Sequence, residues 1–134
     1  MNRKGFTLIE LLIVIVILGI LASLAIPRLA GRTEEARVQA ARSDIEGGLS
    51  TALDLYEMDM GKYPARLDDL IRKPGTAARW KGPYLKKKAI PPDPWKHAYI
   101  YRFPGVHNTS EYDLSSNGAD GVEGTQDDIN NWKS

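Results

Sequence analysis

The chain has 134 residues, which is the length of a single domain of ordinary size. It contains no cysteine, so disulfide bonds, thiolate zinc sites and cysteine nucleophiles are excluded. Its net charge of +1 hides two opposed segments: residues 61–104 carry +8 (11 basic, 3 acidic) and residues 105–134 carry −5 (1 basic, 6 acidic). Opposed segments favour contacts between copies of the chain over binding to one large polyanion.

The first predicted element is an apolar helix that follows two basic residues, Arg3 and Lys4. Residues 6–26 would extend about 31 Å as an α-helix, which is long enough to cross the hydrocarbon core of a membrane. The segment fits a secretory signal peptide with a cleavage site at residues 23–25, a permanent membrane anchor, or a membrane helix that later packs against copies of itself. Flanking charge does not settle its orientation, because four arginines follow it.

The acidic residue Glu10 lies inside this apolar run and separates the three interpretations. A carboxylate at membrane depth costs a few kcal/mol and normally has a partner. A signal peptide has no use for such a residue, and a plain anchor is weakened by it. A glutamate near one end of the run could also reach the lipid headgroups. The pattern therefore favours a helix that packs against copies of itself.

The start of the chain carries a specific resemblance. The processing site of type IV pilins, and of the pseudopilins of type II secretion systems, resembles the stretch Lys4-Gly5-Phe6-Thr7-Leu8-Ile9-Glu10. In that superfamily a prepilin peptidase cuts after the glycine and N-methylates the new terminal residue. The resemblance implies cleavage between Gly5 and Phe6. The Phe6 ammonium of one subunit could then pair with Glu10 of its neighbour, which would neutralise two buried charges.

The helical pattern continues beyond Pro27, because apolar residues recur at spacings of three and four along one face: Val38, Ala41, Ile45, Leu49, Ala52, Tyr56 and Met60. Gly61 is typical of a C-cap, and Pro64 prevents continuation. Since proline lacks an amide hydrogen, Pro27 predicts a kink or local opening near the membrane boundary, and the pair Gly47-Gly48 predicts a second weak point. We expect the amphipathic half to pack on a globular head and the apolar half to protrude.

Turns and strands are expected after this helix. A short helix is predicted around residues 67–71. Residues 98–103 alternate at period two, and residues 112–115 follow after a loop, as in an antiparallel hairpin. The last 20 residues are loop-like. The expected fold class is therefore α+β, with a long N-terminal helix and a small antiparallel sheet in the head.

The head also resembles the major pseudopilins of type II secretion. The similar stretches are Lys62-Tyr63-Pro64, Gly82-Pro83-Tyr84-Leu85, Pro92-Asp93-Pro94-Trp95, Tyr99-Ile100-Tyr101 and residues 112–132. Type IV major pilins usually close a C-terminal loop with a disulfide, which this chain cannot form. Two features depart from the family pattern: Lys96-His97 stands where the family tends to have a Gly-Asn turn, and Asn117 stands where it often has an apolar residue.

A glycine-rich acidic loop at residues 115–128 gathers the hard oxygen ligands that calcium prefers. It lacks the EF-hand pattern. From the residues alone, a calcium site and a solvated loop whose polar side chains form turns both remain open. The resemblance favours calcium, because major pseudopilins carry Ca²⁺ in this loop. It implies side-chain ligands from Asp120 and from Asp127 or Asp128, with carbonyl ligands from Asn117 and Val122.

Two other classes of function are less favoured. Ser115, His107 and Asp113 are close in sequence, but no nucleophile motif surrounds the serine, so we expect no enzyme activity. The basic and aromatic segment 61–104 could bind nucleic acid by charge and stacking. We favour the alternative, in which the same aromatic residues form the core of the head and Lys86–Lys88 form a solvated face, and we therefore expect no nucleic-acid binding. Salt-sensitive DNA binding would instead support a type IV pilin-like subunit for DNA uptake or motility.

The resemblance implies a structural subunit that polymerises into the periplasmic pseudopilus of a type II secretion system and helps drive folded proteins across the outer membrane. The expected segments are a leader peptide (1–5), a transmembrane and assembly helix (6–27) that includes Pro27, and a periplasmic pilin-like domain (28–134). The expected partners are further copies of the chain, minor pseudopilins, the inner-membrane secretion platform, prepilin peptidase and membrane lipid. A partner ATPase would supply the energy, since the chain has no Walker motif.

Overall fold

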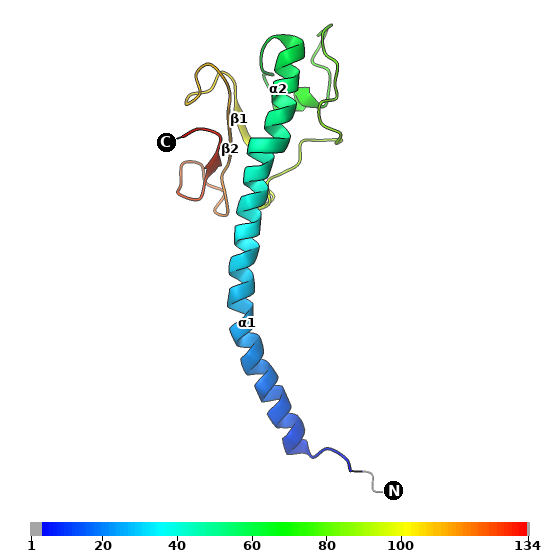
Figure 1. Cartoon of the computed structure of the whole chain (residues 1–134), viewed down its shortest axis with the longest axis vertical. Coiled ribbons are helices and arrows are strands. Elements are labelled where there is room, and N and C mark those ends of the chain that lie inside the picture. Colours follow the sequence, from blue (N-terminus) through cyan, green and yellow to red (C-terminus); the bar gives the residue numbers. More distant parts are fainter. Residues whose placement is uncertain (1–3, 134) are drawn as a thin grey trace. The chain divides into compact units, whose positions relative to one another are not determined.

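The computed structural model describes residues 4–133, except for the side chains of residues 27–30. The chain divides into two compact units, Met1–Ala36 and Arg37–Ser134. Helix α1 (Leu8–Ser43) runs from the first unit into the second and is followed by a π-helical turn, η1 (Asp44–Gly48), and by helix α2 (Leu49–Met60). Figure 1 shows this order along the chain.

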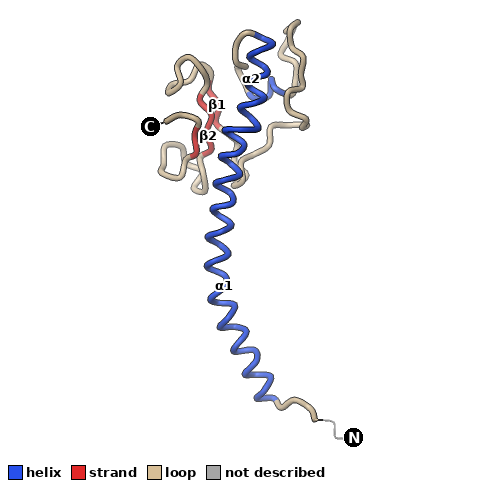
Figure 2. Tube along the Cα trace, viewed as in Figure 1, coloured by secondary structure: helices blue, strands red, loops and turns tan. Residues whose placement is uncertain are grey.

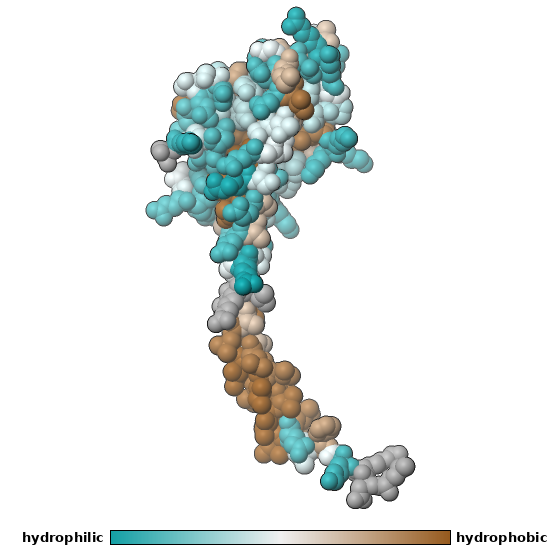
Figure 3. Space-filling view, in the orientation of Figure 1, coloured by the Kyte–Doolittle hydropathy of each residue, from teal (hydrophilic) through white to brown (hydrophobic). Residues whose placement is uncertain are grey.

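The N-terminal part of α1 is apolar and uncovered. Every residue from 8 to 26 is exposed, and a brown apolar surface follows this part of the helix in Figure 3. Its most apolar window has a mean hydropathy of 3.0, so by length and composition the helix can cross a membrane. The backbone of α1 stays helical through Pro27. The side chain of Pro27 lies outside the described residues, and the kink stays a prediction.

The second predicted weak point, Gly47-Gly48, falls in the π-helical turn η1. A π-turn contains one residue more than an α-turn and breaks the regular spacing of hydrogen bonds. Across this turn Ile45 remains fully buried, and the Tyr99 hydroxyl donates a 2.7 Å hydrogen bond to Asp44 Oδ2. The helix ends as predicted at Gly61, which has a φ of 82° and donates its amide hydrogen to the Glu57 carbonyl oxygen.

The head contains a three-stranded antiparallel sheet in the order β1-β2-β3. Its strands are β1 (Ile100–Arg102), β2 (Asp113–Ser116) and β3 (Ile129–Asn130), and Figure 2 shows the first two beside α2. The predicted hairpin is confirmed, with Tyr101 opposite Leu114. The last 20 residues are mostly loop, as predicted, but they include the unpredicted strand β3. In it Ile129 pairs with Ser116, and the buried Ile129 side chain anchors the tail.

The core lies between α2, the sheet and the short 3₁₀ helix η2 (Leu67–Leu70). Its helix residues include the predicted apolar face, with Ile45 and Leu53 fully buried. Aromatic residues complete the core. Tyr99 and Tyr112 are buried in it, and Trp80, Tyr84, Trp95 and Tyr101 are partly buried against the core cluster. Lys86–Lys88 are exposed. The aromatic side chains of the basic segment therefore pack in or against the core, as the second interpretation of that segment predicts.

Lys96 adopts a left-handed backbone conformation, with a φ of 68°, at the position where the family pattern has glycine. For a residue with a Cβ, this conformation raises the free energy of the folded state by roughly 1–2 kcal/mol. Glycine has no steric penalty there but loses more chain entropy on folding. We expect Lys96→Gly to raise the free energy of unfolding by about 0.5–1 kcal/mol. Urea unfolding followed by tryptophan fluorescence measures it. Lys87→Gly is the control, and an equal gain in that variant would contradict the explanation.

Candidate assembly helix and metal-binding loop

The predicted cleavage site lies just before helix α1. Residues 4–7 are outside regular secondary structure, and the Phe6 side chain is 93% exposed. No heavy atom lies within 4 Å of the position that a Cβ on Gly5 would occupy. The peptide bond between Gly5 and Phe6 is thus in an exposed segment without regular secondary structure, where a peptidase could reach it.

Glu10 takes part in a capping box at the start of α1. The Thr7 amide donates a 3.2 Å hydrogen bond to Glu10 Oε2, and the Glu10 amide donates one of the same length to Thr7 Oγ1. These two bonds satisfy amide groups that have no partner within the helix. This role is not among the predictions from the sequence, although threonine followed three residues later by glutamate is a known signature of a capping box.

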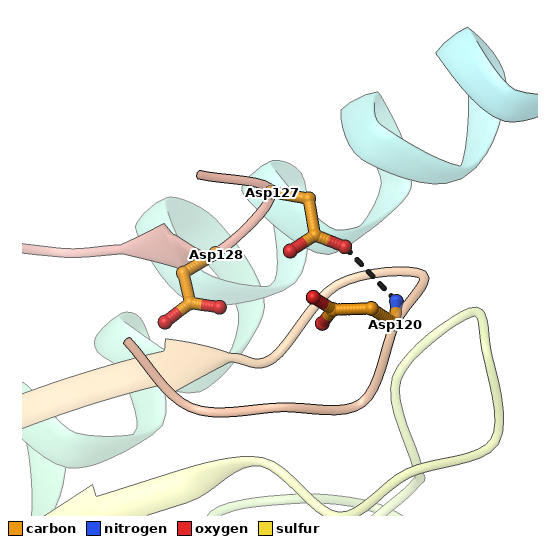
Figure 4. A group of neighbouring side chains, drawn as sticks. All are labelled: Asp120, Asp127 and Asp128. Carbon is orange, nitrogen blue, oxygen red and sulfur yellow. Dashed lines mark hydrogen bonds between the residues drawn. The ribbon is translucent and has the colours of Figure 1, made fainter. Parts of the chain in front are cut away.

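The acidic loop brings together three of the predicted ligands. Oxygen atoms of Asp120, Asp127 and Asp128 all lie within 4.8 Å of one another (Figure 4). The Asp120 amide donates a 2.9 Å hydrogen bond to Asp127 Oδ2, which is the dashed line in Figure 4. Residues from two parts of the loop, at least seven positions apart in sequence, therefore converge at one place.

Hydrogen bonds within the loop fix these carboxylates. Asp128 Oδ2 accepts from the Gly124 amide at 2.7 Å, and Asp120 Oδ1 accepts from the Val122 amide at 2.9 Å. The Thr125 hydroxyl lies 2.5 Å from Asp127 Oδ1. This hydroxyl and the Asp120 amide lower the pKa of Asp127 below its ordinary value, because both stabilise the ionised carboxylate.

Asn117 and Val122 also lie in this loop. The Val122 carbonyl oxygen accepts a 3.0 Å hydrogen bond from Thr125 Oγ1. Among the residues that the structure describes, Asn117 Oδ1 is the buried side-chain polar atom without a hydrogen-bond partner. Buried oxygens are normally paired, so an unpaired one in the same loop as the three carboxylates suits a cation. The donor set of carboxylate, amide and carbonyl oxygens fits calcium.

Two of the three residues considered for catalysis, His107 and Asp113, form a structural contact. His107 Nδ1 lies 3.0 Å from Asp113 Oδ2, and the His107 ring stacks on Trp132 with centroids 4.1 Å apart. Burial raises the pKa of Asp113, but hydrogen bonds from His107, Asn108 and Val106 outweigh it and lower the pKa below its ordinary value. Within the described part of the chain, no hydrogen bond joins Ser115 to His107.

Comparison with known proteins supports the family resemblance of both the N-terminal segment and the head. The family described as "Type II secretion system (T2SS), protein G" matches residues 28–132, and the "Prokaryotic N-terminal methylation motif" matches residues 1–26. Type II secretion system core protein G of Escherichia coli K12 is 45% identical over 98% of this chain and 92% of its own length. The Pseudomonas aeruginosa protein of the same name is 44% identical over 98% and 96%.

A solved structure supports the fold. The crystal structure of the major pseudopilin from the type 2 secretion system of enterohaemorrhagic Escherichia coli matches with a TM-score of 0.62 and 34% identity, over 79% of this chain and 95% of that one. The predicted α+β fold, a long helix with a small antiparallel sheet, is thereby confirmed. The chain belongs to the protein G family of type II secretion systems, the major pseudopilins, and is a structural subunit of the pseudopilus.

Proposed function

We propose that the chain is inserted in the inner membrane as a precursor, loses residues 1–5, and polymerises through residues 6–27 into a filament whose heads lie in the periplasm. The observation that carries this proposal is the uncovered apolar surface of residues 8–26, with Glu10 in it. Each Å² of apolar surface left in water costs about 25 cal/mol, so lipid must cover this surface before assembly. Copies of the same helix cover it afterwards.

Growth of such a filament would help to drive folded proteins across the outer membrane. The partners that we propose are further copies of the chain, minor pseudopilins, the inner-membrane platform, prepilin peptidase and membrane lipid. A partner ATPase would supply the energy. We assign no catalytic step to the chain, since the cluster of His107 and Asp113 serves to hold a loop and the C-terminal tail together.

We further propose that the acidic loop binds Ca²⁺ through Asp120, Asp127 and Asp128, with oxygens of Asn117 and Val122 as further ligands. The clustered carboxylates and the unpaired Asn117 Oδ1 support this proposal. A bound cation would neutralise the repulsion between the carboxylates. In a head without disulfide bonds it would hold the C-terminal tail closed, as the resemblance implies.

Processing gives the first test of the proposed function. We expect Gly5→Arg to block cleavage, so that the leader stays attached and filaments are lost. A Cβ at position 5 meets no heavy atom within 4 Å, and the residue is exposed and outside the head unit, so we expect the head to fold as in the parent. Mass spectrometry of the N-terminus of the purified chain measures processing, and a methylated Phe6 is expected in the parent. Gly5→Ala is the control and should still be cut.

Two results would contradict this account. Normal filaments built from the uncleaved Gly5→Arg precursor would show that processing is not needed for assembly. A mature chain that starts at Ile26 would identify residues 1–25 as an ordinary signal peptide.

A further inference from the structure

The carboxylate of Asp93 is buried outside the acidic loop, in the turn formed by residues 93–97. It is 2% exposed, and both of its oxygens accept hydrogen bonds. Oδ1 accepts from the amides of Trp95, at 3.1 Å, and His97, at 2.8 Å. Oδ2 accepts a 2.6 Å hydrogen bond from the hydroxyl of Ser116, at the end of strand β2. Asp93 thus closes its own turn and also holds a residue 23 positions away.

Ser116 links Asp93 to the acidic loop through a second hydrogen bond of its hydroxyl oxygen. It is fully buried, and its Oγ also accepts a 3.2 Å hydrogen bond from the Gly118 amide. A serine hydroxyl has one hydrogen, and a carboxylate only accepts. The hydrogen of Ser116 therefore goes to Asp93, which leaves an oxygen lone pair for Gly118. Each bond in such a chain polarises and strengthens the next.

Gly118 lies directly against one of the proposed ligands. Its φ is 67°, and a Cβ at this position would overlap the carbonyl oxygen of Asp127. The same Asp127 accepts the Asp120 amide through its carboxylate. A shift of Gly118 would therefore displace Asp127 and, through it, Asp120. The contacts run without a gap from the buried Asp93 to the carboxylate cluster.

We infer that Asp93 is a positioning residue that holds the acidic loop in its calcium-binding shape through Ser116 and Gly118. This inference rests on the calcium site proposed above, and it adds a group that touches no ligand atom. Ordering the loop in advance reduces the entropy that is lost when the ion binds. Groups that orient metal ligands typically change metal affinity 10- to 100-fold when they are removed.

The test is Ca²⁺ binding to the full-length chain in detergent, measured by titration calorimetry. We expect Asp93→Asn to weaken binding about 10- to 100-fold. Asparagine keeps the shape of the side chain and an oxygen for the amides of Trp95 and His97. Its NH₂ group would face Ser116 Oγ and donate to it, so the serine hydrogen would lose its acceptor. The hydrogen bond between residues 93 and 116 would then run in the opposite direction.

Two further variants show whether the effect passes through Ser116. Ser116→Ala removes the hydroxyl that links Asp93 to Gly118 and should weaken Ca²⁺ binding to a similar extent. Because both substitutions break one path, the double variant Asp93→Asn/Ser116→Ala should bind no more weakly than the weaker single variant. Independent effects would instead multiply.

Asp113→Asn is the matched control. Asp113 is 3% exposed, and its carboxylate holds a different loop through the amides of Val106, His107 and Asn108. Its loss should lower the unfolding temperature but leave calcium affinity within about twofold of the parent, because none of these contacts leads to the acidic loop. A general loss of stability is thereby separated from a loss of positioning.

The possible outcomes are distinct. Binding weakened by Asp93→Asn and by Ser116→Ala, but not by Asp113→Asn, supports the inference. Parent-like affinity in Asp93→Asn, or equal losses in Asp93→Asn and Asp113→Asn, overturns it while the calcium site stands. A parent chain that binds no Ca²⁺ overturns the calcium site itself and the inference with it.

Discussion

Replacing Glu10 by glutamine is expected to abolish pseudopilus assembly while the helix still inserts in the membrane. Glutamine can take the place of glutamate in a capping box, so the two hydrogen bonds with Thr7 are retained. Only the charge is lost. In the packed filament the Phe6 ammonium of the neighbouring subunit would then lack its partner, and breaking a buried ion pair costs about 3–5 kcal/mol. Insertion should not suffer, because the uncharged side chain enters the membrane more easily.

The structure provides the control for this experiment. Thr7→Val removes the hydroxyl that accepts the Glu10 amide but leaves the charge of Glu10 in place. We expect Thr7→Val to assemble, and Glu10→Gln and Glu10→Ala to fail. Filaments are counted by electron microscopy, and insertion is measured by the fraction of the chain that resists alkaline extraction from membranes. Assembly by Glu10→Gln together with failure of Thr7→Val would show that capping, not charge pairing, explains the glutamate.

Much of the helical part of the fold follows from local sequence rules. The apolar face from Val38 to Met60 and the cap at Gly61 depend on spacing and on one backbone conformation, and both appear where predicted. The π-turn at Asp44–Gly48 was predictable only as a weak point. Two adjacent glycines indicate where a helix is easily distorted, but they do not specify a π-turn. Strand β3 was missed because it has two residues, and its pairing with β2 is a tertiary contact.

The ligands of the candidate metal site were predicted from the sequence, but the residues that support the loop were not. Glycines and acids in one short loop made the convergence of Asp120, Asp127 and Asp128 a reasonable expectation, because their separation is local. The contact between Asp93 and Ser116 joins a turn of the head to the end of strand β2. No spacing rule covers such a pair, so only the packed structure shows what supports the loop.

Removal of calcium should lower the thermal stability of the head. A ligand that binds only the folded state stabilises it by RT ln(1 + [L]/Kd), which is about 2.7 kcal/mol at a hundredfold excess over Kd. For a domain of this size we expect Tm to fall by roughly 10 °C when a chelator replaces Ca²⁺. Magnesium should restore less of the loss, because it requires a tight octahedral shell and gives up its water reluctantly. Tryptophan fluorescence of the full-length chain reports the transition, since all three tryptophans, Trp80, Trp95 and Trp132, lie in the head unit.

Two substitutions of single carboxylates locate this effect. Asp120→Asn should abolish the rise in Tm with Ca²⁺ and impair filament formation, without changing cleavage after Gly5. Asp68→Asn removes an exposed carboxylate elsewhere in the head and should keep the full response. The comparison matters because any loss of negative charge from an acidic region reduces repulsion, whereas only loss of a ligand removes the response to Ca²⁺. Equal Tm values with calcium, magnesium and chelator in the parent chain would reject the metal site and leave the loop as a solvated turn closed by its own hydrogen bonds.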